Sequence, residues 1–343
     1  MQKLHQRCLL LGAVFITMFF IVVFWDEVRV GPNHRASSKH LAQFKLRQAH
    51  RKHLIKELCS ANRSLNYRQK SFTFDQIPNK ALHHLIVDDH HRVIYCYVPK
   101  VACTNWKRVM FALSQNLKAP DGAPYLDLLD IPLEIIHNST VHKTFSKLWM
   151  RHGRYARPLM HHKLKNYTKF LFVRDPFVRL ISAYRDKLMK PDEYFYTHYG
   201  STMLQRYANI SQPPDSAQEA FRAGIRPSFI HFIQYLLDPK TEKEEPFNEH
   251  WQQMHRLCHP CQIDYDFIGK LETLDEDTEH LLKILGLDKH IHFPPGYENR
   301  TAVDWEKEWF ANISVADRRK LYSLYETDFK LFGYDKPETL LNE

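Results

Sequence analysis

The chain has 343 residues, of which 44% are hydrophobic and 13% aromatic, enough for one large α/β domain or two small ones behind a membrane anchor and a stem. It has only 10 glycines and contains neither G-x-G-x-x-G nor G-x-x-x-x-G-K-[ST], which excludes the usual fingerprints of dinucleotide-binding proteins and nucleoside triphosphatases. The net charge of +9 is concentrated in residues 31–70, where ten Lys or Arg accompany one acid, while residues 71–343 net about −1, so a nucleic-acid partner is not expected.

The N-terminal region predicts a single membrane-spanning helix. Residues 8–25 contain no charged side chain, and these 18 positions are at the short end for a spanning helix. Lys3 and Arg7 precede the run and Asp26 and Glu27 follow it, which favours a cytosolic N-terminus. A cleaved signal peptide is the alternative, but no clear small-x-small cleavage site follows the run. Because a short span suits an early-secretory membrane, we expect a single-pass type II protein of the Golgi membrane.

The predicted organisation has four parts: a cytoplasmic tail (residues 1–7), a signal-anchor (8–25), a luminal stem (26–80) and a luminal catalytic domain (81–343). The stem is rich in charge and poor in aromatic residues, which is typical of a flexible or loosely helical spacer. Six N-x-[ST] triplets agree with a luminal glycoprotein. Their asparagines are Asn62, Asn138, Asn166, Asn209, Asn299 and Asn312.

Of the six cysteines, Cys8 lies at the cytosolic edge of the predicted span, so five are expected in the lumen. Cys258 and Cys261 form a C-x-x-C motif, which is compatible with a redox pair, half a zinc site or a local structural disulfide. Since the chain has no second C-x-x-C, we expect the local disulfide. The odd number leaves at least one thiol free or paired between chains.

The first segment that predicts anion binding is a strand followed by a tight loop and a helix. Residues 93–98 form a β-prone run typical of a buried parallel strand, and Pro99 ends it. Apolar residues then repeat at helical spacing, at Trp106, Val109, Met110 and Leu113. The free N–H groups at such a helix start bind anions, with Lys100 adding a charge and Thr104 a hydroxyl. The alternative is an ordinary turn in which Thr104 or Asn105 merely caps the helix.

A second segment has the same order of elements. Residues 170–173 predict a buried strand, Asp175 can cap the next helix, and Pro176 occupies the favoured first helical position. The apolar stripe of this helix consists of Phe177, Leu180, Ile181, Tyr184 and Leu188. Arg174 and the hydroxyl of Ser182 suit a phosphate, whereas Arg179 and Arg185 are interpreted as solvated.

These two segments together resemble the Golgi carbohydrate sulfotransferases. Residues 97–106 are similar to that family's 5′-phosphosulfate loop, and residues 174–184 are similar to its 3′-phosphate motif. Residues within 245–274 are similar to the chondroitin 4-O-sulfotransferase branch. The resemblance runs from about residue 82 to the C-terminus. It implies an α/β fold, with a parallel sheet and flanking helices in the P-loop-like arrangement of PAPS-dependent sulfotransferases, and a donor at the carboxyl ends of the strands.

The resemblance also implies roles for individual residues, with PAPS (3′-phosphoadenosine 5′-phosphosulfate) as the sulfate donor. The residues implied for the 5′-phosphosulfate are Pro99, Lys100, Val101, Ala102, Cys103, Thr104 and Asn105. The residues implied for the 3′-phosphate are Arg174, Asp175, Pro176, Phe177, Val178, Arg179, Leu180, Ile181 and Ser182.

The implied reaction is an in-line transfer of the sulfuryl group to a sugar hydroxyl. Lys100 would neutralise charge on the bridging oxygen, and the transfer demands no metal ion. His137, in the stretch of residues 131–137 that the family resembles, is the predicted catalytic base; the competing candidates are Glu134, His142, Glu249 and His250. The His250-Trp251 pair could stack against a sugar ring or form a core contact. The expected acceptor is position 4 of N-acetylgalactosamine in chondroitin, with dermatan and glycoprotein N-acetylgalactosamine as alternatives.

Two other functions remain open on the sequence. A Golgi glycosyltransferase has the same topology, and Asp264-Tyr265-Asp266 is a D-x-D triplet of the kind that binds a metal ion. A membrane-tethered glycan-binding protein without catalytic activity would keep the stem and the aromatic residues but would need neither Lys100 nor Arg174.

Overall fold

The computed structural model describes residues 32–61, 73–116, 118, 127–294 and 305–342. The predicted anchor, residues 8–25, and the sequon residues Asn62 and Asn299 lie outside these ranges. None of the helices described is long and apolar enough to cross a membrane. The chain forms two compact units, Met1–His50 and Arg51–Glu343. The described part of the first unit is helical and belongs to α2 (Pro32–Ala61); the second unit holds the sheet and the remaining helices.

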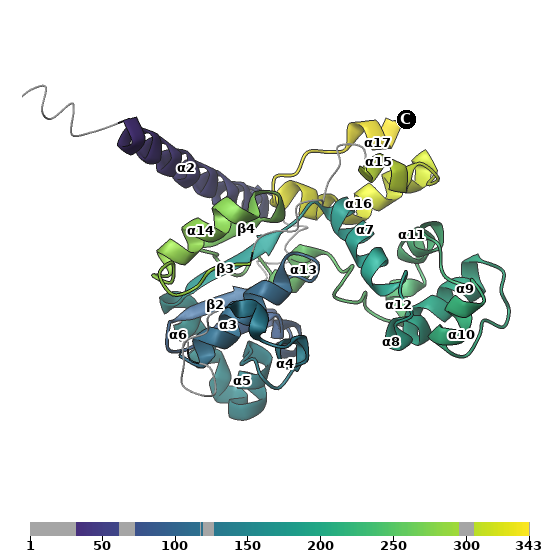
Figure 1. The fold of residues 1–343 in the computed structure, drawn as a ribbon, viewed down its shortest axis with the longest axis horizontal. Helices are drawn as coiled ribbons and strands as arrows, with labels where there is room; N and C mark the ends of the chain where they lie inside the picture. Colours follow the sequence, from purple (N-terminus) through teal and green to yellow (C-terminus); the bar gives the residue numbers. More distant parts are fainter. Residues whose placement is uncertain (1–31, 62–72, 117, 119–126, 295–304, 343) are drawn as a thin grey trace, which may run out of the picture. The chain divides into compact units, whose positions relative to one another are not determined.

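The second unit is built on a four-stranded mixed sheet (Figure 1) in the order β1 (Leu85–Asp88), β2 (Val93–Cys96), β3 (Thr168–Val173) and β4 (Phe267–Lys270). The pairs β2–β3 and β3–β4 are parallel, as predicted, and both predicted strands form. The expectation of a wholly parallel sheet is wrong at one edge, because β1 and β2 pair antiparallel as a hairpin. The turn of residues 89–92 is too short for the crossover that a parallel pair requires.

Helices pack against the strands of the sheet. Helix α3 contacts β1. Helix α14 contacts β4 at the other edge of the sheet, and Figure 1 shows these two side by side. The helices are α3 (Cys103–Ser114), α4 (Leu133–His137), α5 (Phe145–His152), α6 (Ala156–Asn166), α7 (Pro176–Lys187), α8 (Glu193–Phe195), α9 (Ser201–Tyr207), α10 (Ala217–Arg222), α11 (Phe229–Leu237), α12 (Thr241–Glu244), α13 (Met254–Cys258), α14 (Leu274–Ile284), α15 (Trp305–Phe310), α16 (Val315–Leu331) and α17 (Glu338–Asn342).

Aromatic side chains fill the core around the parallel strands. The rings of Tyr95 and Phe170 stack at a centroid distance of 4.8 Å, and the ring of Trp106 from α3 lies 4.8 Å from that of Phe170. Gly269 of β4 is opposite Phe172, where a Cβ atom would lie 2.2 Å from the ring. Glycine is therefore required for β3 and β4 to pair beside this large side chain. The predicted apolar stripe of α7 is confirmed, since all five of its residues are buried in a second core cluster.

Two disulfides lie in the described residues, and both connect distant parts of the second unit. Cys258 pairs with Cys96 at the end of β2, and Cys261 pairs with Cys59 of α2. The expected local Cys258–Cys261 disulfide is therefore wrong. The chain turns between these cysteines at His259, whose φ of 49° is left-handed, so each thiol meets a different element. Cys103 is the free cysteine of the described residues.

Within the second unit, the C-terminal part of α2 contacts β4 and α14. The guanidinium of Arg51 donates to the carbonyl oxygen of Ile268 at 2.8 Å and forms an ion pair with the buried carboxylate of Asp277 at 2.7 Å. Together with the Cys59–Cys261 disulfide, these contacts fix residues that the sequence assigns to the stem. The boundary at residue 80 stays a prediction. The four described sequon residues, Asn138, Asn166, Asn209 and Asn312, are exposed.

Candidate active site

The two segments predicted to bind anions line one cavity of about 980 Å³. They meet because β2 and β3 are parallel neighbours, so the loops after them leave the same edge of the sheet. The Arg174 side chain, after β3, donates from Nη1 to the carbonyl oxygen of Lys100, after β2, at 3.3 Å. The predicted residues that line the cavity are Pro99, Lys100, Ala102, Cys103, Thr104, Asn105, His137, Arg174 and Ser182.

The first loop turns sharply to reach the start of α3. Lys100 (φ 71°) and Ala102 (φ 50°) both have left-handed backbone conformations, which cost about 1–3 kcal/mol each in residues other than glycine. Ala102 is the N-cap of α3 and provides no side-chain hydrogen bond. The alternative in which Thr104 or Asn105 caps the helix is therefore wrong, and the first N–H groups of α3 are not capped by a side chain. Val101 is buried and lies outside the cavity lining.

Lys100 is the central cation of this loop. Its Nζ lies 3.0 Å from Oδ2 of Asp186, on the last turn of α7, and Lys187 and Lys190 also pair with that carboxylate. Burial lowers the pKa of Lys100, and the charge of Asp186 opposes this effect. Although burial opposes ionisation of Asp186, the neighbouring lysines hold the pKa of its carboxyl well below the usual range. The sequence analysis missed this acid, although Asp186 follows Ser182 by four residues and so lies on the same face of the helix.

In the second segment, Arg174 and Ser182 are the predicted residues whose side chains reach the cavity. Asp175 caps α7 as predicted, by accepting hydrogen bonds from the backbone N–H groups of Phe177 at 2.8 Å and Val178 at 3.0 Å. Burial, with the charge of Glu272 adding to it, raises the pKa of Asp175 to about 6 despite these bonds. The apolar residues of the segment are buried and support the helix rather than line the cavity; they are Pro176, Phe177, Val178, Leu180 and Ile181.

A family model described as "Sulfotransferase family" matches residues 83–335, which include the whole cavity up to Trp305. The chain belongs to the sulfotransferase family. It is 61% identical to carbohydrate sulfotransferase 12 of Mus musculus over 296 residues, which cover 86% of this chain and 70% of that protein. It is 42% identical to carbohydrate sulfotransferase 11 of Rattus norvegicus over 292 residues, or 84% of this chain and 76% of that one. No solved structure matches it significantly.

The family resemblance that the motifs predict is thereby confirmed, and this sulfotransferase is an enzyme. Its cavity has the charge that a sulfuryl donor requires. Besides Lys100 and Arg174, it is lined by Arg108, Arg185, Lys187 and Lys190, which the sequence analysis either missed or interpreted as solvated. Asp186 is the acid among them, so cations outnumber anions in the lining.

Arg179 supports the sulfotransferase site without lining the cavity. It is 1% exposed, so the expectation that it is solvated is wrong. Its guanidinium donates to three backbone carbonyls, those of Pro99 at 3.0 Å, Gln252 at 2.7 Å and Glu249 at 2.7 Å. Arg179 thus holds the start of the Lys100 loop against residues 249–252.

Two of the five candidate bases line the cavity, namely His137 and His250. His137 ends α4, and its Nε2 lies 3.4 Å from the hydroxyl oxygen of Thr104. Partial burial lowers the pKa of His137, and the charges of Lys107, Lys187 and Arg108 add to the effect. The ring is therefore neutral near pH 7 and can accept a proton.

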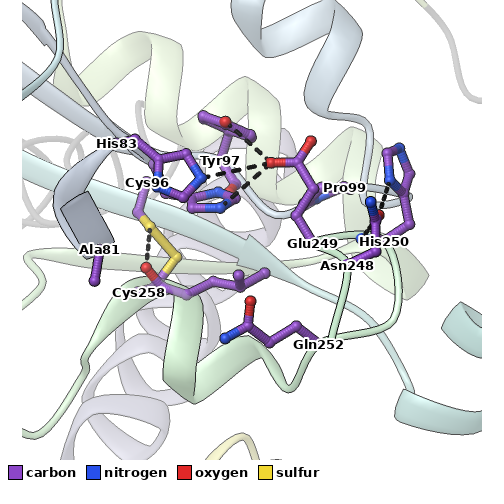
Figure 2. A network of polar contacts seen from close by, with 12 residues as sticks. Ala81, His83, Cys96, Tyr97, Pro99, Asn248, Glu249, His250, Gln252 and Cys258 are labelled. Atoms are coloured by element: carbon purple, nitrogen blue, oxygen red, sulfur yellow. Dashed lines mark hydrogen bonds and ion pairs between the residues drawn. A yellow bond between two sulfur atoms is a disulfide. The ribbon is translucent and has the colours of Figure 1, made fainter. Parts of the chain in front are cut away.

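His250 is held by Asn248, whose Oδ1 lies 2.7 Å from its Nδ1 (Figure 2), and burial lowers its pKa to about 3. The other three candidates lie outside the cavity lining: Glu134 is exposed, His142 is buried against the carbonyl of Ile136, and Glu249 faces Tyr97. Trp251 is fully buried, so of its two interpretations the core contact is correct.

The D-x-D triplet has structural partners. The carboxylate of Asp266 accepts hydrogen bonds from the backbone N–H of Lys169 at 2.8 Å and from its Nζ at 2.7 Å. The hydroxyl of Tyr265 donates to the carbonyl of Cys258 at 2.7 Å. The triplet thus ties the start of β4 to β3 and lies outside the cavity lining.

Proposed function

We propose that this sulfotransferase takes PAPS as its donor and transfers the sulfuryl group to a carbohydrate hydroxyl. The observation that carries the proposal is the junction of the two anion-binding loops, where Arg174 Nη1 lies 3.3 Å from the carbonyl oxygen of Lys100. A nucleotide with phosphate groups at both its 5′ and 3′ positions can engage the Lys100 loop and Arg174 at once. An ordinary nucleotide sugar has no 3′-phosphate for Arg174 and Ser182.

In the proposed mechanism, the acceptor oxygen attacks sulfur in line with the bond to the leaving nucleotide. The new oxygen–sulfur bond forms as the bridging sulfur–oxygen bond breaks, and the electron pair goes to the nucleotide phosphate. Lys100 stabilises the charge on the bridging oxygen, with the N–H groups at the start of α3 around it. His137 takes the proton of the acceptor hydroxyl, and Thr104, at 3.4 Å, helps to orient its ring.

For the acceptor, we propose position 4 of N-acetylgalactosamine in chondroitin, with dermatan as the nearest alternative. This choice is supported by the resemblance of residues 245–274 to the chondroitin 4-O-sulfotransferase branch, and the names of the relatives specify a carbohydrate. A cavity whose lining also includes Arg185, Lys187 and Lys190 suits an acidic polysaccharide. We extend the proposal to the location: a type II protein of the Golgi membrane, anchored by residues 8–25 and glycosylated in the lumen.

The deciding experiment is transfer of labelled sulfate from PAPS to desulfated chondroitin, with disaccharide analysis of the product. We expect 4-sulfated N-acetylgalactosamine, with less product on dermatan or on glycoprotein N-acetylgalactosamine. Manganese-dependent transfer from a labelled nucleotide sugar, with none from PAPS, would instead identify a glycosyltransferase. No transfer, with no thermal stabilisation by adenosine 3′,5′-bisphosphate, would favour a glycan-binding protein without catalytic activity.

A further inference from the structure

Two histidines and a carboxylate converge beside the sulfotransferase cavity. His83 and His84 precede β1, and Glu249 comes from the loop before α13. Figure 2 shows His83 pointing toward the carboxylate of Glu249. Oε2 of Glu249 lies 3.7 Å from Nε2 of His83 and 3.4 Å from Nε2 of His84. The three potential ligand atoms all lie within 4.8 Å of one another. Neither histidine is among the residues that line the cavity.

The other ring nitrogens fix the orientation of both histidines. Nδ1 of His83 lies 2.9 Å from the carbonyl oxygen of Lys80, and Nδ1 of His84 lies 2.7 Å from that of Tyr97. A carbonyl oxygen only accepts hydrogen bonds, so each Nδ1 donates to its carbonyl, and each ring is held with Nε2 directed toward the carboxylate of Glu249. In protein metal sites a ligand histidine is oriented in this way, by donating its other N–H to a carbonyl or carboxylate.

The side chain of His84 is only 1% exposed, so its ring nitrogens need partners within the protein or a bound ion. Its Nε2 is buried and has no hydrogen-bond partner in the described parts of the chain. This nitrogen lies 3.4 Å from Oε2 of Glu249, so a positive centre, a proton or a metal ion, is needed between the two atoms. A buried polar atom that faces a carboxylate without a donor is the arrangement expected of an empty ligand position.

We propose that His83, His84 and Glu249 bind a divalent transition-metal ion, with Zn²⁺ as the preferred ion. Zinc takes imidazole nitrogen and carboxylate oxygen at about 2.0–2.2 Å, so two ligand atoms on a tetrahedral ion lie about 3.3–3.6 Å apart. The two measured nitrogen–oxygen separations are close to this spacing. Two imidazoles select zinc and its transition-metal neighbours over Mg²⁺ or Ca²⁺, which prefer oxygen ligands.

The surroundings also suit a metal ligand set. The hydroxyl of Tyr97 lies 3.2 Å from Oε2 of Glu249 and orients the carboxylate (Figure 2). His83 is about half exposed, which leaves the ion an entry path and a position for water. The ammonium of Lys107, 3.8 Å from the centre of the Tyr97 ring, opposes a second cation, so we expect weaker binding than at a structural zinc site with cysteine ligands.

The ion would connect the loop that bears His250, which lines the cavity, to the segment before β1. Glu249 precedes His250, which lines the cavity, and its carbonyl oxygen accepts a hydrogen bond from Arg179 at 2.7 Å. Bound metal would therefore hold the His250 loop to the segment before β1, next to the Cys96–Cys258 disulfide. Its role is to position this loop, separate from the sulfuryl transfer itself.

The test uses the full-length chain in detergent, without a histidine tag, after treatment with EDTA and its removal. Titration with Co²⁺ should give one equivalent with the visible absorption of a four-coordinate nitrogen–oxygen site, and Zn²⁺ should displace it. His83→Ala, which changes a half-exposed residue, should lose this equivalent, whereas the control His90→Ala, at an exposed histidine in the turn after β1, should retain it.

Two further measurements separate coordination from folding. Tyr97→Phe keeps the three ligands and should weaken Zn²⁺ binding about 10- to 100-fold, as loss of an orienting partner does in other sites. Zn²⁺ should raise the unfolding temperature of the wild type and of His90→Ala but not of His83→Ala. Wild-type protein that binds no ion, or a His83→Ala variant that binds as the wild type does, would overturn the proposal.

Discussion

The Nζ atom of Lys100 lies 3.0 Å from Oδ2 of Asp186, so the cation proposed for catalysis is held by a carboxylate of the same cavity. The two residues come from the loop after β2 and from the last turn of α7, which the parallel pairing of β2 and β3 brings together. A donor that reaches Lys100 competes with Asp186 for the ammonium group. In this account Lys100 acts on the leaving oxygen, whereas Asp186 orients Lys100.

Replacing Lys100 tests the proposed stabilisation of the leaving oxygen. We expect Lys100→Ala to lower kcat about 10²- to 10³-fold, the usual effect of removing one preorganised donor to a developing charge. The unfolding temperature should fall only slightly, because the side chain lines the cavity rather than the core and Lys187 and Lys190 still pair with Asp186. Lys283→Ala, at an exposed lysine, is the matched control. Near-normal turnover of Lys100→Ala would remove this role.

Asp186→Asn should separate donor binding from turnover. Loss of a negative charge from the cavity should tighten the binding of adenosine 3′,5′-bisphosphate about fivefold, or about 1 kcal/mol, and less at high salt. Turnover should fall, because Lys100 loses the group that orients it. Calorimetry and steady-state rates measure the two effects. Weaker nucleotide binding by the variant would contradict this account of Asp186.

The same substitution has a pH signature in stability. The lysines around Asp186 hold its pKa below the usual range of a carboxyl group, so its ionised form stabilises the folded protein at neutral pH. This contribution is lost as pH falls below the carboxyl range of the unfolded chain. The difference in free energy of unfolding between wild type and Asp186→Asn should therefore shrink on acidification. A difference that is constant between pH 7 and pH 3 would contradict the ion pair.

The Cys96–Cys258 disulfide should contribute to stability because it closes a long loop. Its cysteines are 162 positions apart in the sequence, and both are buried. We expect the double variant Cys96→Ala/Cys258→Ala to lose about 2–5 kcal/mol of unfolding free energy, measured by chemical denaturation. Cys103→Ser, at the free cysteine, provides the comparison and should change stability far less. An unchanged double variant would mean that the bond does not form in solution.

Local patterns predicted the strand–loop–helix units well, because each is encoded within a few consecutive residues. Asp175 followed by Pro176 predicts the start of α7, and the apolar stripe from Phe177 to Leu188 predicts its buried face, both as observed. Contacts between residues far apart in the sequence could not be predicted. Nothing in a C-x-x-C motif indicates that Cys258 meets Cys96, since that contact depends on how α13 returns to β2.

In the candidate site, too, local features could be predicted and long-range contacts could not. Lys100 and Arg174 could be assigned to one cavity because parallel strands end at one edge of a sheet. Arg179 could not, since its interpretation as solvated ignored the three carbonyl groups that two distant loops direct at it. The convergence of His83 and His84 on Glu249 likewise joins residues more than 150 positions apart, which no spacing rule detects.

Arg174→Ala should weaken recognition of the 3′-phosphate. A hydrogen bond to a charged group contributes about 1.5–3 kcal/mol, so the Kd for adenosine 3′,5′-bisphosphate should rise about 10- to 150-fold. The binding of adenosine 5′-monophosphate, which lacks the 3′-phosphate, should change little. Calorimetry with both nucleotides measures the two effects, and Arg222→Ala, at an exposed arginine, is the control. Equal losses for both nucleotides would show that Arg174 supports the loop of Lys100 instead.

The acid limb of the activity–pH profile should report the proposed base. Burial and the cations Lys107, Lys187 and Arg108 lower the pKa of His137, so its ring stays neutral below the usual pKa of 6.5. Activity should therefore persist to lower pH than an ordinary histidine would allow, and should fall as pH passes through this lowered pKa. His137→Gln should lower kcat and flatten that limb.

Two variants decide whether the limb belongs to His137. His290→Gln, at an exposed histidine, should keep both the rate and the acid limb of the wild type. His250→Gln tests the other histidine that lines the cavity, whose pKa of about 3 predicts a limb at much lower pH. If the limb persists in His137→Gln and disappears in His250→Gln, His250 takes the proton of the acceptor and His137 only contacts Thr104.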